Sequence, residues 1–109
     1  MLNALTVDVE DYYHVSAFEP YLDYKNWEYL PSRVESNIMR ILEILEDRKV
    51  KATFFVLGWV ADRNPSLIRK IYGEGHEIAS HGYSHKLTYE MTPDEFRDDV
   101  RKSKKAIED

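Results

Sequence analysis

Three short apolar runs divide the chain. Residues 5–9 form a run of apolar and β-branched residues that ends in acids, and residues 52–56 form a second run that contains two phenylalanines. Residues 77–80 form a third, which is shorter but follows the turn-forming Gly73 and Gly75. Runs of this length, bounded by polar or turn residues, predict buried strands.

Apolar residues spaced three or four apart predict helices after each of these strands. The segments cover residues 33–48, residues 65–73 and residues 93 to the end, where the charged run 97–105 is expected to form a solvated helix face. Each segment begins with a signature that satisfies the free N–H groups of a first turn. The signatures are Ser32 with Glu35, Asn64 with Pro65, and Thr92 with Glu95.

Strands that alternate with helices predict parallel pairing through right-handed crossovers, and hence an α/β fold with strands covered on both faces. Three such strands make an incomplete barrel or a very small open sheet, and the chain ends where another strand would follow. We therefore interpret residues 1–109 as a single, truncated domain. The third strand would then have an exposed edge through which two copies could associate.

Composition and charge narrow the class of partner. The chain has no cysteine and no apolar stretch long enough for a signal peptide or a membrane span, which predicts a cytoplasmic location for the chain as given. The net charge is −5, and residues 1–31 hold six acids against one base. This asymmetry argues against nucleic-acid or anionic-membrane partners and favours a cation site, although a solvated acidic loop would look the same.

Chemically versatile side chains follow two of the predicted strands. Asp8, Glu10 and Asp11 lie at the end of the first strand, while His81 and His85 follow the third. Because the carboxyl ends of parallel strands share one side of a sheet, we expect these groups to lie close together. Two histidines and one carboxylate, with room for water, are typical of a catalytic metal site.

Such a site would support hydrolysis, because a bound metal lowers the pKa of water and a neighbouring carboxylate can accept the proton. The histidine spacing by itself is a weak signal. One histidine could instead cap the strand while the other lies on the surface.

The order of these motifs resembles the polysaccharide deacetylase family, carbohydrate esterase family 4. The resemblance rests on residues 6–11, 51–56, 75–78 and 81–85 and covers about residues 4–107. It is nearest to a subgroup that opens with Asp-Val-Glu-Asp-Tyr-Tyr-His, here residues 8–14, and that is associated with bacterial exopolysaccharide gene clusters.

The resemblance implies the amino-terminal part of a distorted (β/α) barrel that holds a divalent metal, usually zinc, and removes N-acetyl groups from amino sugars of a polysaccharide. It implies that Asp8 is the general base and that His81 and His85 are metal ligands. The carboxylate ligand stays open between two acids. Strand alternation favours Glu10, which shares a face with Asp8, but Asp11 could turn inward if the strand has already ended.

The substrate would be a polysaccharide or oligosaccharide, whose sugar rings stack on aromatic side chains. Half of the 14 aromatic residues lie between positions 12 and 29. Tyr12, Tyr13, His14 and Trp59 are the candidate substrate contacts, and packing of the loop onto the fold is the alternative for each.

The resemblance also implies later motifs that these residues do not contain, namely an arginine, an acyl pocket and a histidine general acid. We therefore expect the chain to bind metal and to show little or no turnover by itself. Two other functions stay open. One is hydrolysis of small amides, as in allantoinase-like members, and the other is a non-catalytic metal-binding or assembly role.

Overall fold

The computed structural model describes residues 1–109 and confirms the predicted α/β class. Strands β1 (Thr6–Val9), β2 (Thr53–Val56) and β3 (Glu77–Ser80) pair in parallel, in the order β1-β2-β3. Helical segments separate consecutive strands, as parallel crossovers require. Each of the three predicted strands is therefore present.

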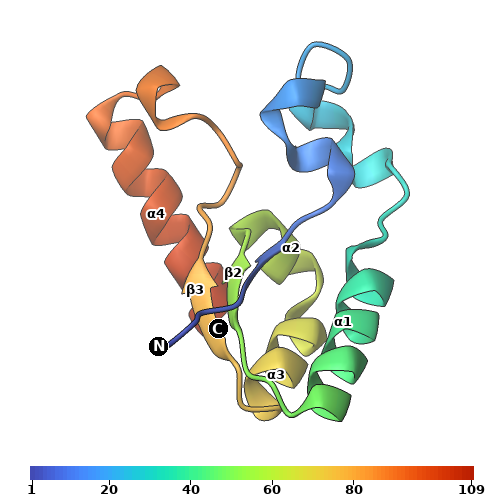
Figure 1. Cartoon of the computed structure of the whole chain (residues 1–109). Helices are drawn as coiled ribbons and strands as arrows, with labels where there is room; N and C mark the ends of the chain where they lie inside the picture. Colours follow the sequence, from blue (N-terminus) through green and yellow to red (C-terminus); the bar gives the residue numbers. More distant parts are fainter.

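The helices are α1 (Val34–Arg48), α2 (Gly58–Arg63), α3 (Pro65–Gly73) and α4 (Pro93–Glu108). Short 3-10 helices occur at Tyr12–His14, Ser16–Phe18, Tyr24–Tyr29 and Thr88–Glu90. Figure 1 shows α1 and α4 on opposite sides of the strands, with α2 and α3 between them. None of these helices combines the length and apolar character that crossing a lipid bilayer needs.

The capping box predicted at Thr92 is present. Its side chain accepts a hydrogen bond from the Glu95 N–H at 3.2 Å, and the Glu95 carboxylate accepts one from the Thr92 N–H at 2.8 Å. The box predicted at Ser32 is wrong. Arg33 occupies the cap position of α1 without a side-chain cap, and the Ser32 hydroxyl donates instead to a carboxylate from the loop after β1.

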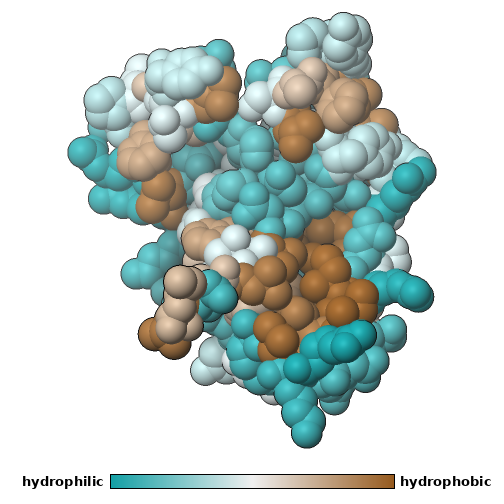
Figure 2. Space-filling view, in the orientation of Figure 1, coloured by the Kyte–Doolittle hydropathy of each residue, from teal (hydrophilic) through white to brown (hydrophobic).

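Apolar burial is concentrated on β2 and the helices behind it. Phe54, Val56, Leu57 and Val60 are fully buried. The expectation that every strand is covered on both faces is wrong for the edge strands, because only Val9 of β1 is buried and β3 has no fully buried residue. Figure 2 accordingly shows apolar side chains open to solvent in the region of the strands.

The register of the sheet determines where the polar residues emerge. Val9, Val56 and Ser80 are partners across the three strands. Glu10 and His81 therefore follow the sheet at the same level, two strands apart, and their backbones are separated by about 10 Å at the usual spacing between strands. Side chains of this length can meet across that gap. Figure 1 shows the segments after β1 and β3 at the same end of the sheet.

Candidate metal centre

Glu10, His81 and His85 lie together at the carboxyl end of the sheet. One oxygen of Glu10, Oε2, lies 3.4 Å from Nε2 of His81 and 3.0 Å from Nε2 of His85. One ligand atom from each residue lies within 4.8 Å of the other two, which is compact enough for a single metal ion. The structure therefore brings together one predicted carboxylate and both predicted histidines.

The two histidines come from one tight loop. His81 directly follows β3, and its N–H donates to the Val56 carbonyl at 2.9 Å, which continues the pairing of β2 and β3 by one residue. The chain then turns through Gly82 (φ 76°) and reaches His85, whose φ of 57° is also positive. This turn directs both imidazoles toward Glu10.

Electrostatics couple these three side chains. Burial by itself raises the pKa of Glu10, but the two imidazoles together outweigh burial and hold that pKa at about 2. The Glu10 carboxylate in turn raises the pKa of His81 and of His85. Glu10 thus favours positive charge at this point, which a bound metal ion would supply.

The carboxylate has an unused acceptor. Glu10 Oε2 is buried and has no hydrogen-bond partner, although two imidazole nitrogens lie close to it. Buried polar atoms are normally paired, so an orphan of this kind calls for an explanation such as an ion. Two imidazole nitrogens and a carboxylate oxygen are a donor set that suits zinc and leaves a position open. The residues present therefore fit a divalent metal.

Asp8 lies beside this group without belonging to it. One oxygen of its carboxylate is 4.0 Å from Nε2 of His81, and its side chain is 55% exposed, against 15% for Glu10. A carboxylate that is open to solvent and next to the metal ligands is in a position to accept a proton from water.

Asp11 lies outside the cluster, and its carboxylate has a different set of partners. It accepts hydrogen bonds from the Ser32 hydroxyl at 2.7 Å, from the Arg33 N–H at 2.9 Å and from the Val34 N–H at 3.3 Å. These are donors at the first turn of α1, where a negative charge is favourable. Asp11 thus caps a helix 22 residues further along the chain.

The aromatic residues of the first loop pack against one another. Tyr13, His14, Trp27 and Trp59 are all buried, and their ring centroids lie 4.4 to 6.2 Å apart in tilted or edge-to-face arrangements. Among the candidate substrate contacts Tyr12 is the exception, because it is 43% exposed. The structure thus gives Trp59 a packing role between α2 and the loop.

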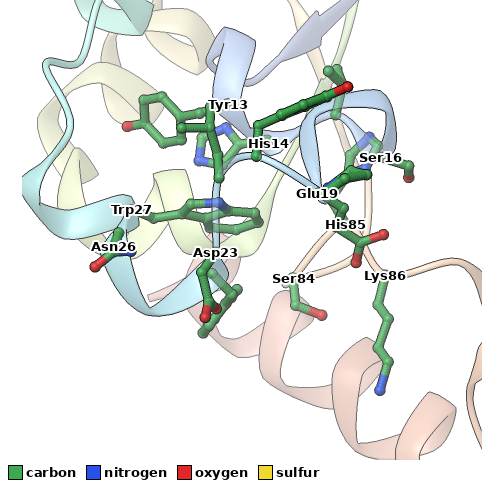
Figure 3. A pocket seen from close by; sticks show the side chains of 15 residues that line it. Tyr13, His14, Ser16, Glu19, Asp23, Asn26, Trp27, Ser84, His85 and Lys86 are labelled. Carbon is green, nitrogen blue, oxygen red and sulfur yellow. The ribbon is translucent and has the colours of Figure 1, made fainter.

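A cavity of about 850 Å³ adjoins His85. Its walls come from the loop between β1 and α1 and from the short segment 84–86. Figure 3 shows Tyr13, His14 and Trp27 on one side of this cavity and Ser84, His85 and Lys86 on the other. Among the candidate substrate contacts, Tyr13 and His14 line the cavity, whereas Tyr12 and Trp59 do not.

Comparison with known proteins identifies the family. Residues 22–109, more than half of the chain, match the family described as polysaccharide deacetylase. The chain belongs to the polysaccharide deacetylase family. The matched residues include His81 and His85 but begin after β1, so this match does not extend to Asp8 and Glu10.

Two curated relatives in this family are named for different saccharides. A peptidoglycan-N-acetylglucosamine deacetylase of Bacillus cereus is 38% identical over 68 residues, which are 62% of this chain and 25% of that protein. A chitooligosaccharide deacetylase of a Bradyrhizobium species is 39% identical over 67 residues, 62% of this chain and 31% of that protein. The chain thus spans about a third or less of the length of these relatives.

Solved structures of the family share the fold over nearly the whole chain. The peptidoglycan deacetylase PdaC of Bacillus subtilis superposes with a TM-score of 0.69 at 28% identity, covering 96% of this chain and 41% of that one. A family pseudoenzyme of Bacillus anthracis gives 0.71 at 27% identity, covering 96% and 30%. Because a pseudoenzyme has the same fold, activity has to be argued from the site residues.

Sequence reasoning missed two residues that shape this candidate site. The run 97–105 was expected to be a solvated helix face, which is wrong for Asp99 and Ser103. Ser103 is fully buried, and Asp99 is half-buried and bonds to the loop between the histidines. Helical spacing gives the only available signal, since residues 96, 99, 103 and 107 lie three or four apart along α4.

Proposed function

We propose that this chain provides the metal site and the general base of a hydrolase that removes N-acetyl groups from amino sugars of a polysaccharide. The proposal is carried by the convergence of Glu10, His81 and His85 on one point, with Asp8 beside them at the carboxyl end of the sheet. The names of the family relatives, which act on peptidoglycan and chitooligosaccharides, support the same reaction.

The metal would be held by Glu10, His81 and His85, and the donor set favours zinc. When bound there, a divalent cation supplies Lewis-acid chemistry, which polarises an amide carbonyl and makes water more acidic. The two imidazoles must be neutral to bind it, so protons leave His81 and His85 as the metal enters. Glu10 keeps its negative charge throughout, because its pKa is far below neutrality.

Asp8 would act as the base. Its carboxylate lies close enough to the ligands to accept the proton of an attacking water, and its exposure keeps it in contact with solvent. Asp8 is not needed to hold the metal, since the other three residues complete the donor set. Loss of Asp8 should therefore separate metal binding from hydrolysis.

The saccharide would occupy the cavity beside His85. Its walls combine the exposed rings of Tyr21 and Tyr24 with polar groups. The polar groups include Ser84 and Lys86 (Figure 3). Aromatic faces and hydrogen-bonding groups together suit a sugar ring, which presents both an apolar face and hydroxyls. The likeness of residues 8–14 to an exopolysaccharide-associated subgroup favours an exopolysaccharide that carries N-acetyl groups.

Zinc titration of the purified chain tests the metal site. We expect one zinc ion per chain by elemental analysis and calorimetry. Glu10→Ala, His81→Ala and His85→Ala should each weaken binding by at least about 100-fold, more than the loss of an outer-shell partner costs. Less than one ion per chain at neutral pH would contradict the proposal and favour a non-catalytic assembly role.

Acetate release from an N-acetylated chitooligosaccharide tests the reaction. The zinc-loaded chain should release acetate slowly, and removal of zinc by a chelator should stop it. Asp8→Asn is the matched variant, because it should keep zinc affinity and lose the release. Where the wild type shows zinc-dependent release, an equal rate for Asp8→Asn would refute the role of Asp8, and hydrolysis of small cyclic amides alone would indicate an allantoinase-like activity.

A further inference from the structure

The loop between the two histidines has a conformation that needs external support. It contains no strand or helix between Ser80 and the 3-10 turn at Thr88–Glu90. Both Gly82 and His85 have positive φ values, which is uncommon for a residue with a Cβ such as His85. Contacts made by the rest of the chain must therefore hold this backbone in place.

A single carboxylate from α4 supplies three of these contacts. One oxygen of Asp99, Oδ2, accepts the N–H of Tyr83 at 2.9 Å. The other oxygen, Oδ1, accepts the N–H of Ser84 at 3.2 Å and its hydroxyl at 2.7 Å. Both oxygens of Asp99 are thus bonded to residues that lie between His81 and His85.

The sequence is adapted to this close approach. A Cβ placed on Gly82 would lie 3.2 Å from Oδ2 of Asp99, and the φ of 76° at Gly82 already favours glycine. The loop backbone passes so near the carboxylate that a side chain at position 82 would crowd it. Asp99 and Gly82 therefore form one matched contact.

The other side of the loop is attached to α2 and to the buried hydroxyl of α4. The Gly82 carbonyl accepts hydrogen bonds from the Gly58 N–H at 2.8 Å and from the Ser103 hydroxyl at 3.0 Å. The Tyr83 carbonyl accepts the Trp59 N–H at 3.1 Å. The carbonyls are thus fixed by α2 and Ser103, while the N–H groups are fixed by Asp99.

We infer that Asp99 is a positioning residue for the metal centre, which sets the separation and orientation of His81 and His85 by holding the N–H groups of Tyr83 and Ser84, two of the three residues between them. The inference rests on the proposed metal site. Asp99 touches neither imidazole, so its effect would pass through the backbone of Tyr83 and Ser84. Its charge strengthens these bonds, because hydrogen bonds to a carboxylate are stronger than neutral ones.

Substitution of Asp99 should weaken zinc binding. Asp99→Ala removes all three hydrogen bonds. Asp99→Asn keeps the size of the side chain, but its amide group is a donor and cannot accept a hydrogen bond from the N–H group that it faces. We expect losses of zinc affinity of about 100-fold and about 10-fold, within the range found when outer-shell partners of metal ligands are removed. Competition with a chromophoric chelator measures the affinity.

Asp98→Asn is the control, because Asp98 is the exposed neighbour on the same helix, carries the same charge and bonds to no part of the loop. It should change zinc affinity by less than about twofold, since exposed charges interact weakly. The visible spectrum of the cobalt-substituted chain provides a second readout. Its bands should shift in Asp99→Asn and stay unchanged in Asp98→Asn, because they report the geometry around the ion.

Several outcomes would overturn the inference. One is zinc affinity within about twofold of the wild type in a folded Asp99→Asn chain, and another is an equal loss in Asp98→Asn, which would indicate a general charge effect. If Asp99→Ala does not fold, Asp99→Asn still decides. Failure of the wild type itself to bind zinc would instead refute the proposed function, as would binding that survives His81→Ala.

Discussion

Asp8, Glu10 and Asp11 are neighbouring acids, but the structure predicts opposite effects when the carboxylate of Glu10 or of Asp11 is removed. Asp11→Ala should destabilise the fold and leave zinc affinity nearly intact. Glu10→Ala should leave the stability of the fold nearly intact and weaken zinc binding. The reason is that Asp11 bonds to the first turn of α1, whereas Glu10 Oε2 has no hydrogen-bond partner and lies between two imidazoles.

The magnitude for Asp11 follows from its three donors. Loss of a helix cap costs about 0.5–2 kcal/mol, and a hydrogen bond to a charged group contributes about 1.5–3 kcal/mol. Because these contributions overlap and water can reach part of the site, we expect a total loss of about 3 kcal/mol. At the entropy of unfolding typical of a domain of this size, that corresponds to a fall in Tm of about 10–15 °C.

Asp11→Asn is the matched control, because it keeps one acceptor oxygen and removes the charge, and it should lose about half as much stability. Thermal unfolding followed by circular dichroism, in the presence of a chelator, measures the stability of all three variants. For Glu10→Ala we expect a change of about 1 kcal/mol or less without metal, since partly exposed imidazoles can release their protons when the carboxylate is absent.

Zinc titration completes the test. Zinc affinity should fall by at least about 100-fold in Glu10→Ala and by less than about threefold in folded Asp11→Ala. An equal loss of affinity in the two variants would show that Asp11 is the carboxylate ligand, and our reasoning from the helix cap would then be wrong. A melting temperature for Asp11→Ala within about 3 °C of the wild type would refute the estimate of stability.

Three further results are expected. Gly58→Ala should lower stability by about 1–3 kcal/mol, because the new Cβ would lie 2.6 Å from the Tyr83 ring and 2.9 Å from the Ser103 backbone, whereas Gly73→Ala, with open space around it, should be neutral or slightly stabilising by thermal unfolding. Saturation to 100 times Kd with zinc should raise the free energy of unfolding by about 2.7 kcal/mol, measured by urea titration. Burial lowers the pKa of His14 from 6.5 to about 4. Between these pH values only the unfolded chain takes up a proton, so the free energy of unfolding should fall by up to about 3 kcal/mol as the pH drops. His14→Gln should flatten this pH dependence, and an unchanged pH profile in that variant would contradict the prediction.

The order of the strands and of the three longer helices could be predicted because each of these elements carries a local signal, whereas the short helix α2 was not predicted. Two strands are apolar runs, and α4 begins at a proline preceded by a complete capping box. The start of α1 was predicted to within one residue, but its capping partner could not be predicted, because that partner lies 22 positions earlier. Short-range patterns contain no information about such a partner.

The grouping of the candidate metal ligands could be predicted in part for the same reason. Parallel pairing places the ends of β1 and β3 on one side of the sheet, so Glu10 and His81 follow from topology alone. The burial of Tyr13 and His14 could not be predicted, because it depends on how the loop of residues 12–29 folds back over the sheet. Asp99 was missed because a charged helical run is normally exposed.

The acids around the site divide into two classes that net charge cannot distinguish. Asp11 and Asp99 each accept three hydrogen bonds from backbone and hydroxyl donors, so the charge of Asp11 holds the start of α1 and the charge of Asp99 holds the loop between the two histidines. Glu10 Oε2 faces the two imidazoles, neither of which makes a hydrogen bond to it, and Asp8 is half exposed. A buried carboxylate whose donors are satisfied gains little from a cation, whereas an unsatisfied one gains a great deal. The hydrogen-bond donors around each carboxylate therefore separate two groups of acids. Asp11 and Asp99 hold the backbone around the site, whereas Glu10 and Asp8 are available to bind a metal ion or accept a proton.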